Sequence, residues 1–116
     1  MAFTGSCHCG KLKYRVDEDK PTKAMACNCS RCRRTGALHH FTAPDKFQRE
    51  ADEGDIQTFE WNRKVITYEF CKTCGCAPFA HGTGPNGPMV EINLRCADDI
   101  DVDALEISRF DGAHKL

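Results

Sequence analysis

Eight of the nine cysteines lie in three short clusters whose spacing is typical of metal ligands. The clusters are Cys7-x-Cys9, Cys27-x-Cys29-x-x-Cys32, and Cys71-x-x-Cys74-Gly75 with Cys76 directly behind it. Thiolates separated by one or two intervening residues can reach one small cation from a single turn, whereas disulfide partners usually lie far apart in sequence. The clusters therefore predict a zinc protein.

The first and third clusters predict one closed structural zinc site. Cys7 and Cys9 are two residues apart, so both side chains lie on the same side of an extended segment. Cys71 and Cys74 form a zinc knuckle, in which Gly75 can adopt the positive φ that turns backbone amides toward the sulfurs. A zinc ion bound by all four thiolates closes a long loop and contributes folding free energy. The alternative is two independent or redox-active thiol pairs.

The central cluster predicts a different kind of zinc site. Cys27, Cys29 and Cys32 supply three thiolates and leave a fourth position for water or substrate, which distinguishes catalytic from structural zinc. Such a metal lowers the pKa of a bound thiol or water, or polarises a carbonyl oxygen. The alternative is a second structural site that a fourth side chain closes. The candidates for that fourth side chain are Cys76, Cys96, His39, His40 and His81.

The segments that position these clusters read as short strands. Strands are expected at 11–16, 22–27, 38–43, 56–61, 65–70 and 89–94, with an extended segment at 105–110. A helical turn is expected at 30–34, an exposed loop at 48–55, a hairpin connection at 62–64 and a turn-rich loop at 82–88. Few windows have helical periodicity, so the fold class is mainly β, with antiparallel sheets and zinc knuckles at strand ends.

Two groups of side chains near the central cluster have alternative interpretations. His39 and His40 are consecutive in an expected strand, so at most one of them faces the metal. Arg31, Arg33 and Arg34 surround the third ligand and can hold the carboxylate of an anionic thiol such as glutathione. The interpretation we favour for the arginines is a solvated basic turn, because exposed charges contribute little.

Length and composition limit the functional classes. The 116 residues predict a single domain, 1–116. A formal net charge of −1 argues against the basic surface that nucleic-acid binding requires. The absence of a long apolar run and of a signal peptide predicts a cytoplasmic protein without a membrane partner. In the reducing cytoplasm, a high cysteine content indicates metal binding and not disulfide bonds. A homodimer is expected only as a general property of small soluble enzymes.

Three motifs together resemble the glutathione-dependent formaldehyde-activating enzyme family, which shares its domain with centromere protein V. They are Gly5-Ser6-Cys7-His8-Cys9-Gly10, Cys27-Asn28-Cys29-Ser30-Arg31-Cys32-Arg33-Arg34-Thr35-Gly36-Ala37, and Phe70-Cys71-Lys72-Thr73-Cys74-Gly75. The resemblance implies a β-rich, Mss4-like (β-tent) fold with two zinc ions. It also implies that the outer cysteine pairs hold the structural zinc and that Cys27, Cys29 and Cys32 hold the catalytic zinc.

The activity that names this family is the condensation of glutathione with formaldehyde to S-hydroxymethylglutathione. The resemblance therefore implies a zinc-dependent carbon-sulfur lyase that handles a small thiol, such as glutathione, or a thiol-aldehyde adduct. The competing hypothesis is a non-catalytic zinc module for protein or nucleic-acid contact. A three-thiolate site at the floor of a pocket supports the enzyme, whereas two buried four-thiolate sites under a flat surface support the module.

Overall fold

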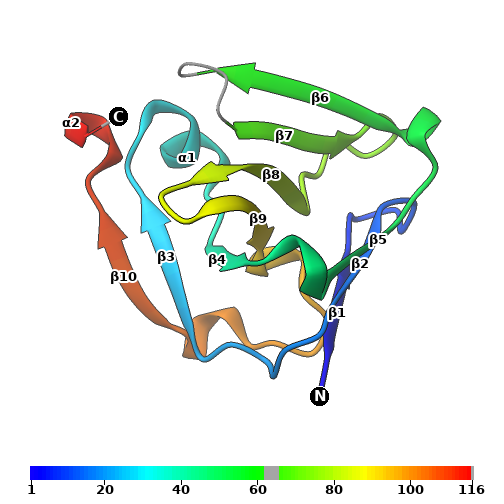
Figure 1. Ribbon diagram of the computed structural model, residues 1–116, viewed down its shortest axis with the longest axis horizontal. Coiled ribbons are helices and arrows are strands. Elements are labelled where there is room, and N and C mark those ends of the chain that lie inside the picture. Colours follow the sequence, from blue (N-terminus) through cyan, green and yellow to red (C-terminus); the bar gives the residue numbers. More distant parts are fainter. Residues whose placement is uncertain (62–65, 116) are drawn as a thin grey trace.

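Short strands make up most of the structure, a computed structural model that describes residues 1–61 and 66–115 (Figure 1). The strands are β1 (Phe3–Ser6), β2 (Lys13–Val16), β3 (Lys23–Cys27), β4 (His39–Thr42), β5 (Phe47–Glu50), β6 (Ile56–Trp61), β7 (Ile66–Cys71), β8 (Phe79–Gly84), β9 (Gly87–Asn93) and β10 (Glu106–Phe110). The helices are α1 (Ser30–Thr35) and α2 (Gly112–Lys115), with 3-10 helices η1 (Pro44–Lys46), η2 (Glu53–Asp55), η3 (Leu94–Cys96) and η4 (Val102–Ala104). The mainly β architecture predicted from the sequence is confirmed.

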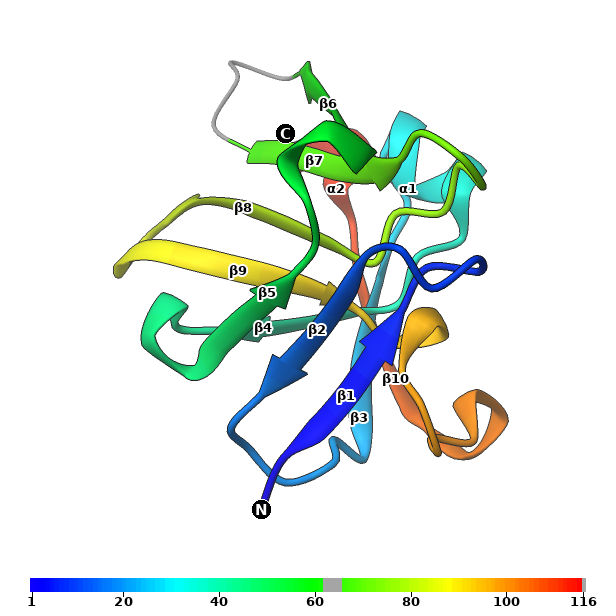
Figure 2. The same cartoon turned by 90° about the vertical axis from the view of Figure 1, so that its right-hand side faces the viewer.

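These strands form two sheets. The larger has the order β10-β3-β4-β9-β8-β7-β6, and the smaller has the order β1-β2-β5. Figure 2 turns the smaller sheet toward the viewer, with strands of the larger sheet behind it. β1 in the smaller sheet ends just before Cys7, and β7 in the larger sheet ends at Cys71. Each sheet thus delivers one of the two outer cysteine pairs.

One hydrophobic core joins the two sheets. In β2 the polar residues are exposed while Tyr14 and Val16 are buried, which is the alternation expected of a half-buried strand. The Tyr14 ring packs edge-on against Phe79 of the larger sheet, with ring centroids 6.2 Å apart. Burying side chains of this size stabilises the fold by about 1.5–3 kcal/mol each, so this packing fixes how the sheets meet.

The smaller sheet contains two strands that the sequence did not predict. No element was expected at β1. The segment expected as an exposed loop at 48–55 is mostly exposed, but its first three residues belong to β5 and its last three form η2. β2 lies between these two strands and pairs antiparallel with both. β5 exposes three of its four residues and half-buries only Phe47. Its sequence therefore has no alternating apolar signal, and only the pairing with β2 makes it a strand.

The larger sheet departs from expectation at two places. The turn-rich loop expected at 82–88 is mostly strand, because β8 and β9 pair from Phe79 to the Gly84–Gly87 pair. β10 pairs with β3 in parallel, whereas antiparallel sheets were expected. Phe110 pairs with Cys27, so β10 lies beside the strand that delivers the central cluster. The connection expected at 62–64 lies outside the described residues.

No helix in the described part of the chain has the length and apolar character needed to cross a membrane.

Gly5 is a close-contact position in β1. A Cβ atom at this residue would overlap the Tyr14 ring and hydroxyl and would lie 2.5 Å from the carbonyl oxygen of Cys96. We expect Gly5→Ala to lower the free energy of unfolding by about 2 kcal/mol, because neither a buried ring nor backbone moves easily. Gly54→Ala is the matched control, since a Cβ there meets nothing within 4 Å. Urea unfolding of zinc-loaded protein measures both, and equal stability of the two variants would contradict the expected clash.

Candidate functional site

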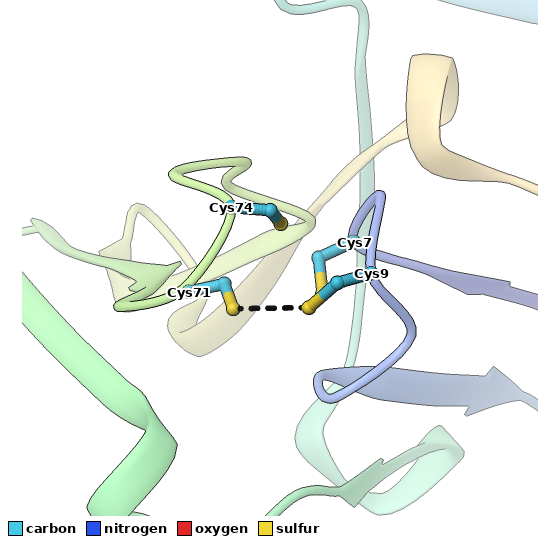
Figure 3. Close-up of side chains that lie close together, drawn as sticks. All are labelled: Cys7, Cys9, Cys71 and Cys74. Carbon is cyan, nitrogen blue, oxygen red and sulfur yellow. Dashed lines mark hydrogen bonds between the residues drawn. The ribbon is translucent and has the colours of Figure 1, made fainter.

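Four cysteines from the two sheets meet at one place (Figure 3). The sulfurs of Cys7, Cys9, Cys71 and Cys74 all lie within 4.8 Å of one another. The Cys9 sulfur is 3.7 Å from that of Cys7 and 3.6 Å from that of Cys71. The structure therefore brings together the two pairs that the sequence predicted to form one site, although they are more than 60 positions apart in the chain.

Local backbone geometry aims these sulfurs at a common point. Cys7 and Leu12 close a tight loop, in which the Leu12 amide donates to the Cys7 sulfur at 3.3 Å. In the knuckle, the Thr73 amide donates to the Cys71 sulfur at 3.3 Å, and Gly75 has a φ of +79°. Amide donors favour the anionic form of sulfur. The backbone amides of Cys74 and Thr73 accordingly lower the pKa of the Cys71 thiol.

The donor set fits a four-coordinate zinc ion. Zinc-sulfur bonds of about 2.3 Å in a tetrahedron place the sulfurs about 3.8 Å apart. The two sulfur-sulfur distances of 3.6 and 3.7 Å agree with that spacing. Four thiolates with no open position are typical of structural zinc. This group of cysteines can hold a metal ion.

The central cluster forms a second group at the junction of β3 and α1. The sulfurs of Cys27, Cys29 and Cys32 lie within 4.8 Å of one another. The Cys29 sulfur caps α1 and accepts a hydrogen bond from the Cys32 amide at 3.3 Å. The helical turn predicted at 30–34 is present as α1, and Gly36, with a φ of +73°, ends this helix. This short helix folds the third cysteine back toward the first two.

The alternation expected at the consecutive histidines is confirmed. His39 is buried and places its Nε2 atom 3.2 Å from the Cys32 sulfur. His40 points the other way, with its Nε2 atom 2.7 Å from Glu18 Oε1. His39 nevertheless does not belong to the central metal-binding group, in which all ligand atoms lie within 4.8 Å of one another.

The other candidates for a fourth ligand lie elsewhere. His81 is exposed and places its Nδ1 atom 2.9 Å from Glu69 Oε1. Cys76 and Cys96 are half-buried against the core, and burial raises the pKa of the Cys96 thiol to about 12. Neither belongs to a metal-binding group among the described residues. Among the described residues, the central group has three sulfur donors, and His39 is the one of these candidates whose ring nitrogen approaches it, at 3.2 Å from the Cys32 sulfur.

His39 has a buried acidic neighbour that the sequence did not reveal. Glu91 on β9 places its Oε1 atom 3.3 Å from His39 Nδ1. Burial lowers the pKa of His39 to about 4, and it raises the pKa of Glu91 to about 7 despite the opposing charge of Arg31. The contact is therefore a close approach of a neutral imidazole to a carboxyl group and not a fully charged ion pair. The other Glu91 oxygen, Oε2, is buried and has no hydrogen-bond partner among the described residues.

The raised pKa of Glu91 predicts a pH-dependent stability. The folded value of about 7 exceeds the usual 4.5, so burying this carboxyl costs nothing in acid and progressively more as the pH rises toward 7. Zinc-loaded Glu91→Gln should therefore gain about 2 kcal/mol relative to the parent between pH 5 and pH 8. Chemical unfolding at both pH values measures this difference. If the free energies of unfolding of the two proteins changed equally between pH 5 and pH 8, the raised pKa of Glu91 would be contradicted.

A cavity of about 820 Å³ opens onto the central cysteines. The three cysteines and His39 form part of its wall, and the tip of the β8–β9 hairpin, from Gly84 to Met89, forms another part. A volume of this size accommodates a small organic molecule. The central sulfurs thus face a pocket, whereas the four outer sulfurs are not among its lining residues.

The three arginines around the third ligand do not line this pocket. The Arg31 guanidinium lies over the rings of Tyr68 and Phe59, at 4.1 and 5.0 Å from their centroids. Arg34 donates to the carbonyl oxygen of Ser30 in its own helix at 2.8 Å. Arg33 is exposed. Arg33 and Arg34 thus agree with the solvated basic turn favoured from the sequence, whereas Arg31 is half-buried and lines a neighbouring cavity of about 580 Å³.

Asn28 is a second residue whose part in the site was missed. Its side chain donates to Asp111 Oδ1 at 3.0 Å and accepts from the Ala113 amide at 2.9 Å. These bonds hold the C-terminal segment beside the central cluster and bring Phe110 to the pocket wall. A polar residue between two cysteines is a weak signal for such a contact, because its partners are more than 80 positions away.

Comparison with known proteins agrees with the motifs. The model of the family described as glutathione-dependent formaldehyde-activating enzyme matches residues 2–108, which include both cysteine groups. A crystal structure of a protein from Rhodobacter sphaeroides superposes with a TM-score of 0.75 at 20% sequence identity, covering 90% of this chain and 99% of that chain. That likeness shows a shared fold. The chain belongs to the glutathione-dependent formaldehyde-activating enzyme family.

Proposed function

We propose that the protein is a zinc-dependent enzyme of the carbon-sulfur lyase type, which joins a small thiol to an aldehyde or releases the thiol from the adduct. The observation that supports this most strongly is the group of three sulfurs on the wall of a pocket. A three-cysteine site leaves one coordination position open, and the cavity gives a substrate access to it. A flat surface over a closed site would have favoured a binding module.

The two cysteine groups have different parts in this proposal. Cys7, Cys9, Cys71 and Cys74 hold a structural zinc that ties the two sheets together. Cys27, Cys29 and Cys32 hold a second zinc at the pocket. When bound there, zinc supplies a positive charge that stabilises a thiolate at neutral pH.

The reaction is balanced without a further reactant. The sulfur of the thiol forms a bond to the aldehyde carbon, the carbonyl double bond becomes a single bond, and the thiol proton ends on the former carbonyl oxygen. The pocket walls hold the two molecules next to each other, which removes much of the entropic barrier to their encounter. The reverse reaction cleaves the carbon-sulfur bond of the adduct.

Thiol-dependent consumption of formaldehyde by purified zinc-loaded protein tests the proposal. We expect a rate above the uncatalysed reaction for at least one member of a panel of small thiols, and we expect removal of the metal by a chelator to abolish it. If no thiol in the panel reacts faster than without protein, and none perturbs the metal site, the protein is not this kind of enzyme.

A further inference from the structure

The pocket beside the central cysteines is largely apolar. Side chains from five strands contribute, so the apolar wall does not depend on one loop. They are Met25 from β3, Phe41 from β4, Ile66 and Tyr68 from β7, Met89 from β9 and Phe110 from β10. Apolar surface of this extent favours a ligand whose own surface is apolar, because burial removes both surfaces from water.

The charged groups of the pocket do not match glutathione. Glutathione carries two carboxylates, which need cationic partners, but Lys46 is the one lysine or arginine among the described lining residues. Lys46 lies 3.9 Å from Glu18, which itself accepts hydrogen bonds. Burial raises the pKa of Glu18, but its contacts with His40 and Thr42 outweigh this and keep the pKa below the usual range. The carboxylate of Glu18 therefore offsets the one cationic side chain among the described lining residues.

A second carboxyl group, and no second lysine or arginine, lies among the described lining residues. Glu91 also lines the pocket, with its side chain 9% exposed. Arg31 lies over the rings of Tyr68 and Phe59, outside the lining of this pocket, and its charge acts on Glu91 from there. Bringing a ligand carboxylate close to the Glu18 carboxylate and the cysteine thiolates costs electrostatic free energy.

We propose that this site takes a thiol with an apolar substituent, or the aldehyde adduct of such a thiol, in preference to glutathione. The inference rests on the proposed function and specifies its substrate class. The apolar substituent lies against the side chains of Phe41, Met89 and Phe110, and the thiol sulfur faces the three cysteines. The bonds made and broken are those of the thiol-aldehyde reaction already described, with no additional reactant.

Calorimetric titration of the zinc-loaded protein with two thiols tests this preference without relying on turnover. The probes are phenylmethanethiol and glutathione. Burial of one aromatic group corresponds to about a tenfold to hundredfold gain in affinity, so we expect phenylmethanethiol to bind at least about tenfold more tightly. Equal affinity, or tighter binding of glutathione, overturns the inference.

Two phenylalanines provide a matched pair of variants. Phe41 is 39% exposed and lines the pocket, whereas Phe59 is 45% exposed and does not. Phe41→Ala should weaken phenylmethanethiol binding about tenfold, and Phe59→Ala should change it less than about twofold. Equal effects of the two substitutions would show that the apolar wall does not select the ligand. Thermal melting of both variants verifies that they are folded.

A positive charge introduced at the pocket wall tests whether electrostatics contributes to the preference for an uncharged thiol. Met89→Lys places an ammonium group in the pocket, so we expect weaker binding of phenylmethanethiol and tighter binding of glutathione than in the parent protein. An unchanged ratio of the two affinities overturns the inference.

If the parent protein binds and turns over glutathione preferentially, the substrate class is wrong but the proposed function stands. If neither thiol binds or reacts, the proposed function fails as well.

Discussion

Cys71→Ser is expected to unfold the protein or to reduce it to a loosely packed state at room temperature. Cys71 is buried at the end of β7, and its sulfur lies 3.6 Å from that of Cys9 in the connection between β1 and β2 of the other sheet. A structural zinc ion contributes roughly 10 kcal/mol or more of apparent binding free energy, which is as large as the whole stability of a small domain. Circular dichroism and the dispersion of amide NMR signals measure the loss.

Cys76→Ser is the matched control for this substitution. Cys76 lies close to the knuckle in sequence and is half-buried, but it is outside the group of four sulfurs. We expect the control to remain folded and to lose at most about 1 kcal/mol. A Cys71→Ser protein that is as stable as the Cys76→Ser protein would show that no metal joins the two sheets at this place.

Cys29→Ser is expected to abolish thiol-dependent turnover while the fold persists. Cys29 belongs to the group of three sulfurs and also caps α1. A serine hydroxyl can still accept the capping hydrogen bond, so the short helix keeps its start. Loss of a thiolate ligand weakens zinc at the pocket, and the metal's contribution of several kcal/mol corresponds to a decrease of about a thousandfold or more in kcat/KM.

The thermal midpoint separates this effect from unfolding. We expect Cys29→Ser to melt within about 8 °C of the parent protein, because a loss of about 1 kcal/mol shifts the midpoint of a domain of this size by that amount at most. Cys96→Ser is a second cysteine variant outside both groups and should retain turnover. If Cys29→Ser kept full activity, the central cysteines would have no catalytic part. If Cys29→Ser unfolded as completely as Cys71→Ser, the assignment of a structural role to the outer cysteines and a catalytic role to the central cysteines would be wrong.

The cysteine groups could be predicted from the sequence because their chemistry depends on local spacing. A two-residue spacing in an extended segment, or a knuckle with glycine at positive φ, fixes the direction of two sulfurs without any distant contact. The association of Cys9 with Cys71 followed from counting ligands, and the sulfurs are indeed 3.6 Å apart. The alternation that separates His39 from His40 is equally local.

The features that were missed depend on residues far apart in the chain. β5 is a strand because it pairs with β2, and its own residues have no alternating pattern. β10 pairs in parallel with β3, which the order of strands along the chain does not reveal. The contact of Glu91 with His39 comes from the register of β9 against β4, in which Glu91 pairs with Phe41 and His39 with Asn93. Such diagonal neighbours become visible only once the register is known.

The pocket was the least predictable part of the site. Its apolar wall gathers residues from β3, β4, β7, β9 and β10. A turn-rich loop was predicted at 82–88, where the β8–β9 hairpin in fact forms one side of the pocket. The arginines nearest the ligands in sequence do not line this pocket. A sequence motif fixes which atoms can bind the metal, whereas the shape and charge around them depend on the packing of the whole sheet.

Zinc K-edge X-ray absorption, together with zinc content per chain, is the most direct test of the two-site account. We predict two zinc ions that share seven sulfur ligands, with one nitrogen or oxygen ligand at the central site. Addition of a thiol substrate should replace that light atom and bring the total to eight sulfurs. A single zinc ion per chain, or eight sulfurs before any thiol is added, would contradict the account.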